Sequence, residues 1–344
     1  QVEMDRMPLL DVRELKIYYR TTRGCNKAVD GVSFSLDEGE SIGLVGESGC
    51  GKSTSARGII RVMPRNAYIA GGEVVFDGED LVRLPESRMR EIRWNKLSLI
   101  PQAAMDSLNP VYPVVDQFVE VLCLKGGMSR RQARERAREL FRMVGLDGER
   151  LTYYPHEFSG GMKQRAVIAL ALALNPKLVI ADEPVTALDV IVQSQILREL
   201  KRLRRDLGIS LIMITHDVSV VADICESVVV MYAGRVVEKG AVRDVLKGPA
   251  HPYTMGLKNA FPDLRNPRRT LISIEGSPPD LVDAPEGCRF AARCPFREAS
   301  CEERAPELVE VSPGHYSACF RLDDIDSLRR KAEEVETWQK VAIS

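Results

Sequence analysis

A glycine-rich segment that contains a lysine and a serine, residues 46–53, carries the clearest chemical signal. It fits G-x-x-x-x-G-K-[ST], follows the apolar stretch Ser41–Val45 and precedes a helix-compatible stretch, Thr54–Arg61. Backbone N–H groups of such a loop surround a phosphate, and the following helix adds positive charge. Lys52 would reach the β- and γ-phosphates, and the Ser53 hydroxyl would bind Mg²⁺. The predicted nucleotide-binding residues are Gly46, Glu47, Ser48, Gly49, Cys50, Gly51, Lys52, Ser53 and Thr54.

Two adjacent carboxylates follow a second apolar stretch, residues 178–181. Asp182 stands where an aspartate would hold the Mg²⁺ shell, and Glu183 stands where a base would polarise the attacking water. Two adjacent carboxylates after a strand more often mark only the point where the strand reaches solvent. The upstream phosphate loop favours the catalytic interpretation here.

A second anion-binding pattern is formed by Ser159, Gly160 and Gly161, just before an alanine-rich stretch with helical character. A hydroxyl and bare backbone amides at the start of a helix attract negative charge. Two phosphate sites in one chain are redundant unless the second serves the nucleotide of another subunit. The second site would then serve the nucleotide of another subunit.

In this order the motifs resemble those of the ATP-binding cassette (ABC) ATPases, over about residues 8–245. The signature of that family is Leu-Ser-Gly-Gly-Gln, and this chain departs from it at Phe158 and Met162. Its Ser-Gly-Gly centre is intact. Met162 would make the contact to the nucleotide of the partner chain slightly less polar.

The resemblance also implies roles for four residues that would be weak candidates alone. Gln102 would touch Mg²⁺ and relay to the membrane subunit, and Asp189 belongs to the segment Ala187-Leu188-Asp189, which resembles the D-loop. His216 would contact the γ-phosphate. Tyr19 would stack on adenine, with Tyr18 as the alternative.

The elements that position these residues follow an α/β pattern. Strand-like stretches such as Val32–Leu36 alternate apolar and polar residues, whereas Ser129–Val144 has the spacing of a helix that Gly145 ends. Later strand–helix alternation predicts a parallel sheet covered by helices. The predicted fold is an ABC-type P-loop NTPase: a RecA-like core with antiparallel β and helical subdomains, followed by a loop-rich metal-binding module.

Composition divides the chain further. We expect a cassette over 8–247, whose helical subdomain covers about 103–165, and a proline-rich linker over 248–284. A four-cysteine module over 285–322 and an amphipathic helical tail over 323–344 would follow. The apolar stripe of the tail is expected to pack on the body of the chain.

Four of the eight cysteines fall within 32 residues: Cys288, Cys294, Cys301 and Cys319. Four thiolates can hold zinc or a [4Fe–4S] cluster. The surrounding sequence resembles the C-terminal extension of dipeptide and oligopeptide importer ATPases, as does His251-Pro252-Tyr253-Thr254. The resemblance implies a [4Fe–4S] cluster, with zinc second and free thiols third. Cys25, Cys50, Cys123 and Cys225 are expected to be ordinary buried residues.

Composition excludes several classes. The net charge of −1 over 344 residues argues against a DNA-coating protein or a polybasic membrane binder, and no nucleic-acid partner is expected. No apolar run reaches the roughly 18 residues of a membrane span. Residues 1–6 do not have the charged-then-apolar pattern of a signal peptide, so we expect a cytoplasmic chain. Met7 would be a sensible native start.

The resemblance implies an ATP-hydrolysing subunit that drives import, using ATP and Mg²⁺. Its expected partners are a second ABC ATPase subunit (a paralogue rather than a copy), two membrane permeases and an extracytoplasmic solute-binding protein. The chain would lie at the cytoplasmic face of the membrane. Peptides are the expected solute, with oligosaccharides or metal chelates as alternatives. A non-transport ABC ATPase or a redox-sensing module is less favoured.

Overall fold

The structure is a computed structural model that describes residues 7–102, 106–186, 188–260, 272 and 274–339. The chain forms two compact units. The first consists of Leu36–Ser41 and Arg83–Ile214 together with the residues before Leu10. The second consists of Leu10–Ser35, Ile42–Val82 and Thr215–Ser344.

Three parallel strands form the sheet of the first unit. β7 (Leu178–Asp182) pairs with β6 (Leu97–Ile100) on one side and β8 (Ser210–Thr215) on the other. Every residue of β7 is buried, as expected for a parallel strand covered on both faces. The helices of this unit are α2 (Glu86–Asn95), α3 (Val114–Leu124), α4 (Arg130–Met143), α5 (Gly160–Ala171) and α6 (Val190–Leu207), with 3₁₀ turns η2 (Gly148–Thr152) and η3 (Pro155–Glu157).

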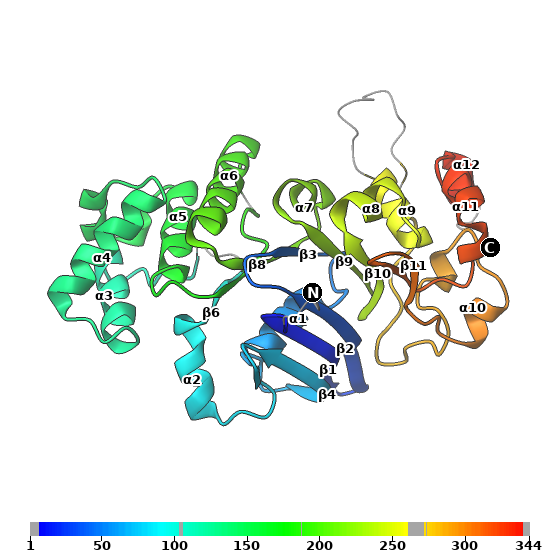
Figure 1. The fold of residues 1–344 in the computed structure, drawn as a ribbon, viewed down its shortest axis with the longest axis horizontal. Helices are drawn as coiled ribbons and strands as arrows, with labels where there is room; N and C mark the ends of the chain where they lie inside the picture. Colours follow the sequence, from blue (N-terminus) through cyan, green and yellow to red (C-terminus); the bar gives the residue numbers. More distant parts are fainter. Residues whose placement is uncertain (1–6, 103–105, 187, 261–271, 273, 340–344) are drawn as a thin grey trace, which may run out of the picture. The chain divides into compact units, whose positions relative to one another are not determined.

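Helices α3, α4 and α5 pack together, with α4 in contact with both of the others (Figure 1). The helix predicted over Ser129–Val144 is α4, and Ser129 caps it through a reciprocal hydrogen bond with Gln132. In the core of this helical group, Phe141 forms edge-to-face pairs with Phe118 and with Phe158. The departure from the family signature at Phe158 is thus a buried ring that completes an aromatic cluster.

The second unit contains a small antiparallel sheet in the order β2-β1-β4-β5, drawn in blue in Figure 1. A further run of strands pairs β3 in parallel with β9, and continues antiparallel through β10 and β12 to β11. The bounds of these elements are β1 (Leu10–Thr21), β2 (Gly24–Leu36), β3 (Ser41–Val45), α1 (Lys52–Ile59), β4 (Ala67–Phe76), β5 (Glu79–Asp80), α7 (Val218–Ile224), β9 (Ser227–Tyr232), β10 (Arg235–Ala241), α8 (Val242–Lys247), β11 (Val309–Ser312) and β12 (His315–Ser317).

The C-terminal region adds α9 (Pro252–Asn259), η4 (Ala291–Arg293), α10 (Ser300–Glu303), η5 (Leu322–Asp324), α11 (Ile325–Ala332) and α12 (Val335–Gln339). Helix α9 lies inside the predicted linker and is almost wholly buried. The predicted helical tail is two short helices within the described residues, and residues 340–344 lie outside them. Its stripe packs on the chain itself, as expected: Leu328, Ala332 and Trp338 are buried.

Burial of the scattered cysteines agrees with the prediction only in part. Cys50 and Cys225 are buried, whereas Cys123 is half-buried and Cys25 is exposed, so the prediction was wrong for Cys25. Cys25 lies at the beginning of β2, just after the turn that joins β1 to β2, where solvent reaches the chain. In the described ranges, no helix combines the length and apolar character needed to cross a membrane.

Candidate functional site

The glycine-rich segment forms a loop between β3 and α1, as predicted. Gly51 has φ +105°, and a Cβ there would lie 2.4 Å from the Ala28 carbonyl oxygen, so only glycine fits. Lys52 is 5% exposed, and its Nζ donates to the carbonyl oxygens of Gly46 at 2.7 Å and Glu47 at 2.9 Å. The ammonium is therefore held over the centre of the loop. The fit to a phosphate is good: the loop has a cation, α1 begins at it, and a side chain would crowd its backbone at Gly46 and Gly51.

Other residues of the loop divide between its tip and its base. Ser48 and Gly49 are exposed, whereas Cys50 is buried with its Sγ 3.5 Å from Lys52 Nζ. Burial raises the pKa of the Cys50 thiol, so the thiol is neutral near pH 7 and poorly reactive. Ser53 and Thr54 lie half-buried in the first turn of α1.

The two neighbouring tyrosines of β1 are directed to different partners. The Tyr19 hydroxyl shares a hydrogen bond of 3.1 Å with Thr54 Oγ1, whereas the Tyr18 hydroxyl donates to Asp30 Oδ1 at 2.9 Å. Successive side chains of a strand point to opposite faces. Tyr19 is thus the tyrosine that lies against the phosphate-loop helix, which favours it over the alternative.

The predicted base, Glu183, follows β7 and is contacted by two donors. Its Oε2 accepts from Gln102 Nε2 at 3.3 Å and from Thr186 Oγ1 at 3.1 Å. Its backbone has φ +48°, a left-handed conformation that strains a residue with a Cβ. The structure thus brings Gln102 and Glu183 together. Asp182 is 2% exposed at the end of β7.

Ser159 is the N-cap of α5, and its hydroxyl accepts from the backbone N–H of Met162. A Cβ on Gly161 would lie 2.7 Å from Val192 Cγ1, so the glycine lets α5 approach α6 closely. Asp189 caps α6 by accepting from the N–H of Val192 at 3.0 Å. The two motifs therefore meet at Val192. Ala187, which belongs to the predicted D-loop, lies outside the described residues.

His216 directly follows β8 and is exposed. Sequence reasoning missed two residues that touch the phosphate loop. The Tyr253 hydroxyl accepts from the backbone N–H of Glu47 at 2.8 Å, and Arg293 donates to the Glu47 carboxylate at 2.8 Å. The local sequence could not predict either contact, because Tyr253 and Arg293 each lie more than 200 residues from the loop in sequence.

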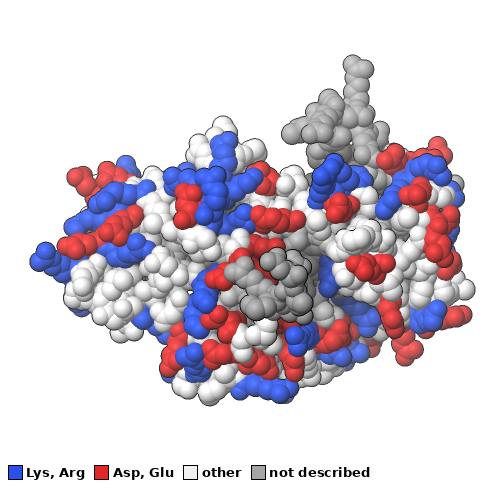
Figure 2. All heavy atoms as spheres, viewed as in Figure 1, with Lys and Arg blue, Asp and Glu red and all other residues white. Residues whose placement is uncertain are grey.

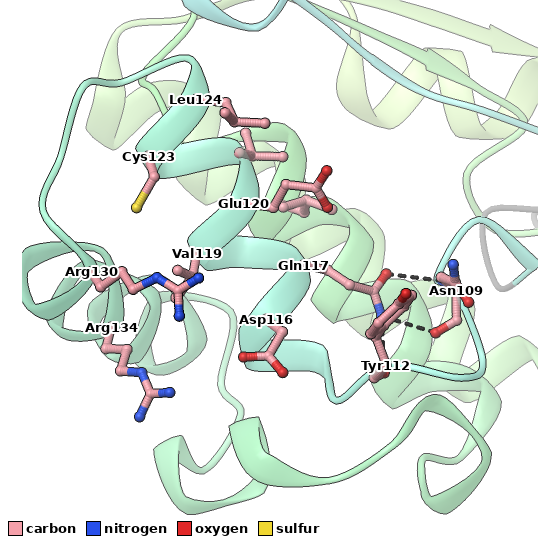
Figure 3. A pocket seen from close by; sticks show the side chains of 12 residues that line it. Asn109, Tyr112, Asp116, Gln117, Val119, Glu120, Cys123, Leu124, Arg130 and Arg134 are labelled. Carbon is pink, nitrogen blue, oxygen red and sulfur yellow. Dashed lines mark hydrogen bonds between the residues drawn. The ribbon is translucent and has the colours of Figure 1, made fainter.

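A groove of about 800 Å³ lies on the helical part of the first unit. Figure 3 shows α3 along it, with Glu120 and Leu124 on one side and Arg130 and Arg134 of α4 nearby. Gln117 bridges to the backbone of Asn109 through two hydrogen bonds, which fixes the loop before α3. Where Figure 1 places α3, the visible surface is partly uncharged (white in Figure 2). The exposed apolar side chains of α3 and of the loop before it include Leu124 (75%), Val111 (70%) and Tyr112 (55%).

The four clustered cysteines line one small cavity together with His251. Burial raises the pKa of the Cys288 and Cys294 thiols, and it raises that of Cys319 to about 11. The cavity is about 10 Å³, room for about one water. Among the residues that the structure describes, no set of three or more His, Cys, Asp or Glu side chains has an arrangement that could hold a metal ion. The four cysteines line the same cavity, but as they stand they do not form a metal site, and binding a metal group would need their side chains to move apart.

Comparisons with known proteins agree with this geometry. Residues 29–186 match the ABC transporter family, and residues 237–301 match the oligopeptide/dipeptide transporter C-terminal region. A probable peptide ABC transporter ATP-binding protein, y4tR of Sinorhizobium fredii, is 48% identical over 93% of this chain and 97% of that protein. The oligopeptide transport ATP-binding protein OppD of Escherichia coli is 46% identical over 91% of this chain and 93% of OppD.

A solved structure of the ATP-binding cassette MJ0796, dimeric and bound to ADP and phosphate, shares the fold. It superposes with a TM-score of 0.62 at 29% identity and covers 68% of this chain and 99% of that cassette. The fold and the phosphate loop thus define an ABC ATPase cassette, which confirms the predicted cassette fold. The chain belongs to the family of ABC transporter ATP-binding proteins, and within it to the oligopeptide/dipeptide importer type.

Proposed function

We propose that this chain is the ATP-hydrolysing subunit that drives a membrane importer of di- and oligopeptides. The observation that carries the proposal is the phosphate loop, in which Lys52 is held over a glycine cradle at the start of α1. The relatives named peptide and oligopeptide transport ATP-binding proteins support the solute class. Oligosaccharides and metal chelates are the alternatives.

The roles follow from the chemistry of each side chain. Lys52 neutralises phosphate charge, and Mg²⁺, when bound, would be held by Ser53, Gln102 and Asp182. Glu183 acts as the base toward water, and His216 contacts the γ-phosphate. Tyr19 contributes its ring to the adenine site.

A second ATPase subunit, a paralogue, would complete the site with its own signature motif. In this chain that motif is Ser159, Gly160 and Gly161, with Asp189 close to it through Val192. Val190 and Ile191 are 76% and 70% exposed at the start of α6. Large apolar side chains beside polar contact residues are typical of a surface that a partner covers. ATP binding would close the pair and hydrolysis would reopen it.

The groove along α3 is the surface that we assign to the permeases. Its lining includes the exposed side chains of Tyr112, in the loop before α3, and Leu124, the last residue of α3, and a short helix of a permease could lie between them. The chain would thereby lie at the cytoplasmic face of the membrane. An extracytoplasmic solute-binding protein would deliver the peptide to the permeases.

Leu124→Arg should weaken assembly with the permeases without changing ATP hydrolysis by the isolated chain. A charge at an interface core is unfavourable because it is desolvated without a partner. Co-purification with the permeases and ATPase assays of the free chain measure the two effects. Lys125→Ala, at the neighbouring position, is the control. Equal assembly of wild type and Leu124→Arg would rule out the groove.

The cysteine module completes the proposal. We assign Cys288, Cys294, Cys301 and Cys319 as ligands of a [4Fe–4S] cluster, with zinc second. Their convergence on one cavity supports the assignment. The cluster would join segments of the C-terminal region that otherwise contain little regular structure.

Peptide uptake tests the function directly. Cells that lack this chain are complemented with wild type or with Lys52→Ala, and uptake of a labelled peptide, an oligosaccharide and a metal chelate is followed. We expect Lys52→Ala to reduce peptide uptake to the level of the uncomplemented cells, because the phosphate charge is no longer neutralised. Restored uptake of only the sugar or the chelate would contradict the peptide assignment.

A further inference from the structure

Two buried arginines lie directly beside clustered cysteines in sequence. Arg289 follows Cys288, and Arg293 precedes Cys294. Each arginine is 6% exposed. An arginine is almost never this buried unless it is paired, so the partners of the guanidinium groups are informative. Arg289 pairs with Asp30, and Arg293 pairs with Glu47 of the phosphate loop.

The guanidinium of Arg293 is held by four acceptors. It donates to Glu47 Oε2 at 2.8 Å and the Tyr232 hydroxyl at 3.1 Å, and to the carbonyl oxygens of Ile274 at 2.9 Å and Glu275 at 2.8 Å. Because these acceptors lie on different segments of the chain, the guanidinium group of Arg293 can occupy only one position. The ion pair is largely shielded from water, where charge-assisted hydrogen bonds are stronger.

Glu47 is restrained at three points. Its carboxylate accepts from Arg293, its backbone N–H donates to the Tyr253 hydroxyl, and its carbonyl oxygen accepts from Lys52 Nζ. Two of these restraints come from the C-terminal region, and the third is the lysine that the phosphate requires. A displacement of Glu47 would therefore move the lysine as well.

We propose that Arg293, acting through Glu47, is a positioning residue for the phosphate loop. The C-terminal region then contributes to nucleotide affinity as well as to the stability of the chain. Tyr253 assists by holding the backbone of the same residue. The proposal rests on the proposed binding of ATP at this loop, and it does not require a metal group at the cysteines.

Nucleotide titration of the full chain tests this inference. The dissociation constant for MgATP is measured by calorimetry for wild type, Arg293→Ala, Arg293→Lys, Glu47→Ala and the Arg293→Ala/Glu47→Ala double variant. We expect each alanine variant to bind about tenfold more weakly, within the usual range for coupled sites. The double variant should bind no more weakly than either single variant, since both remove the same ion pair. Arg293→Lys should recover part of the affinity because it keeps the charge.

Arg321→Ala is the matched control. Arg321 also lies near a clustered cysteine, two residues after Cys319, but it pairs with Asp324 and Glu298 on the surface. Its loss should leave the dissociation constant unchanged. An equal effect of Arg321→Ala would overturn the proposal, because the effect would then come from general loss of the module.

Four further outcomes are informative. A lower Tm with unchanged MgATP affinity in Arg293→Ala would leave that arginine a structural role only and overturn the proposal. The proposal would also be overturned if the loss of MgATP affinity in the double variant equalled the sum of the losses in the two single variants. Should Arg293→Ala fail to fold, Glu47→Ala and Arg293→Lys carry the same test. Wild-type affinity in Lys52→Ala would instead overturn the proposed ATP site on which this inference rests.

Discussion

Replacement of Glu183 by Gln should lower steady-state ATP hydrolysis about 10²–10⁴-fold, the usual contribution of a general base. The amide keeps the size of the side chain and can still accept hydrogen bonds from Gln102 and Thr186, but it cannot take a proton from water. Nucleotide binding should persist, because Lys52 and the phosphate loop are unchanged. Turnover is measured by phosphate release under saturating MgATP.

The variant should also retain ATP in a stable dimer. With hydrolysis blocked, the closed pair of cassettes cannot reopen, so size-exclusion chromatography with MgATP should show a dimer that wild type does not accumulate. Thr186→Ala is the companion variant, because Thr186 donates to the same carboxylate oxygen without chemistry of its own. We expect it to reduce turnover far less. Unchanged hydrolysis by Glu183→Gln would remove Glu183 as the base.

The phosphate loop could be predicted from sequence because all that it needs is local. Gly51 and Lys52 belong to one short segment, and the neighbouring strand and helix have their own patterns. The place of Glu183, directly after a buried strand, was predictable for the same reason. Its strained backbone and its contact with Gln102, 81 residues away, had no sequence signal.

Other features required the tertiary structure. Alternation along β1 places Tyr18 and Tyr19 on opposite faces, but it does not tell which face meets the phosphate-loop helix. Proline content predicted a linker around Pro252, yet that proline is at the first turn of α9, where its missing N–H costs nothing. The Arg293–Glu47 pair joins residues that are 246 positions apart, beyond any periodicity.

The full chain purified without oxygen should be brown and should contain about four irons per chain, if the cysteines hold one [4Fe–4S] cluster. Desolvation in the protein raises the pKa of the Cys288, Cys294 and Cys319 thiols, so their neutral form is favoured without a cation. Bound iron would supply the positive charge that ionises them. Metal analysis and visible absorption measure the cluster directly.

Cys294→Ser should abolish the colour and the iron, because Cys294 is buried in the cavity that the four cysteines share. Cys225→Ser is the matched control, since Cys225 is equally a buried cysteine but does not line that cavity. Colourless protein with one zinc per chain would contradict the iron assignment while keeping the four ligands. Colourless protein without metal would contradict a metal group at these cysteines, and the module would then be held by packing and by ion pairs such as Arg289–Asp30.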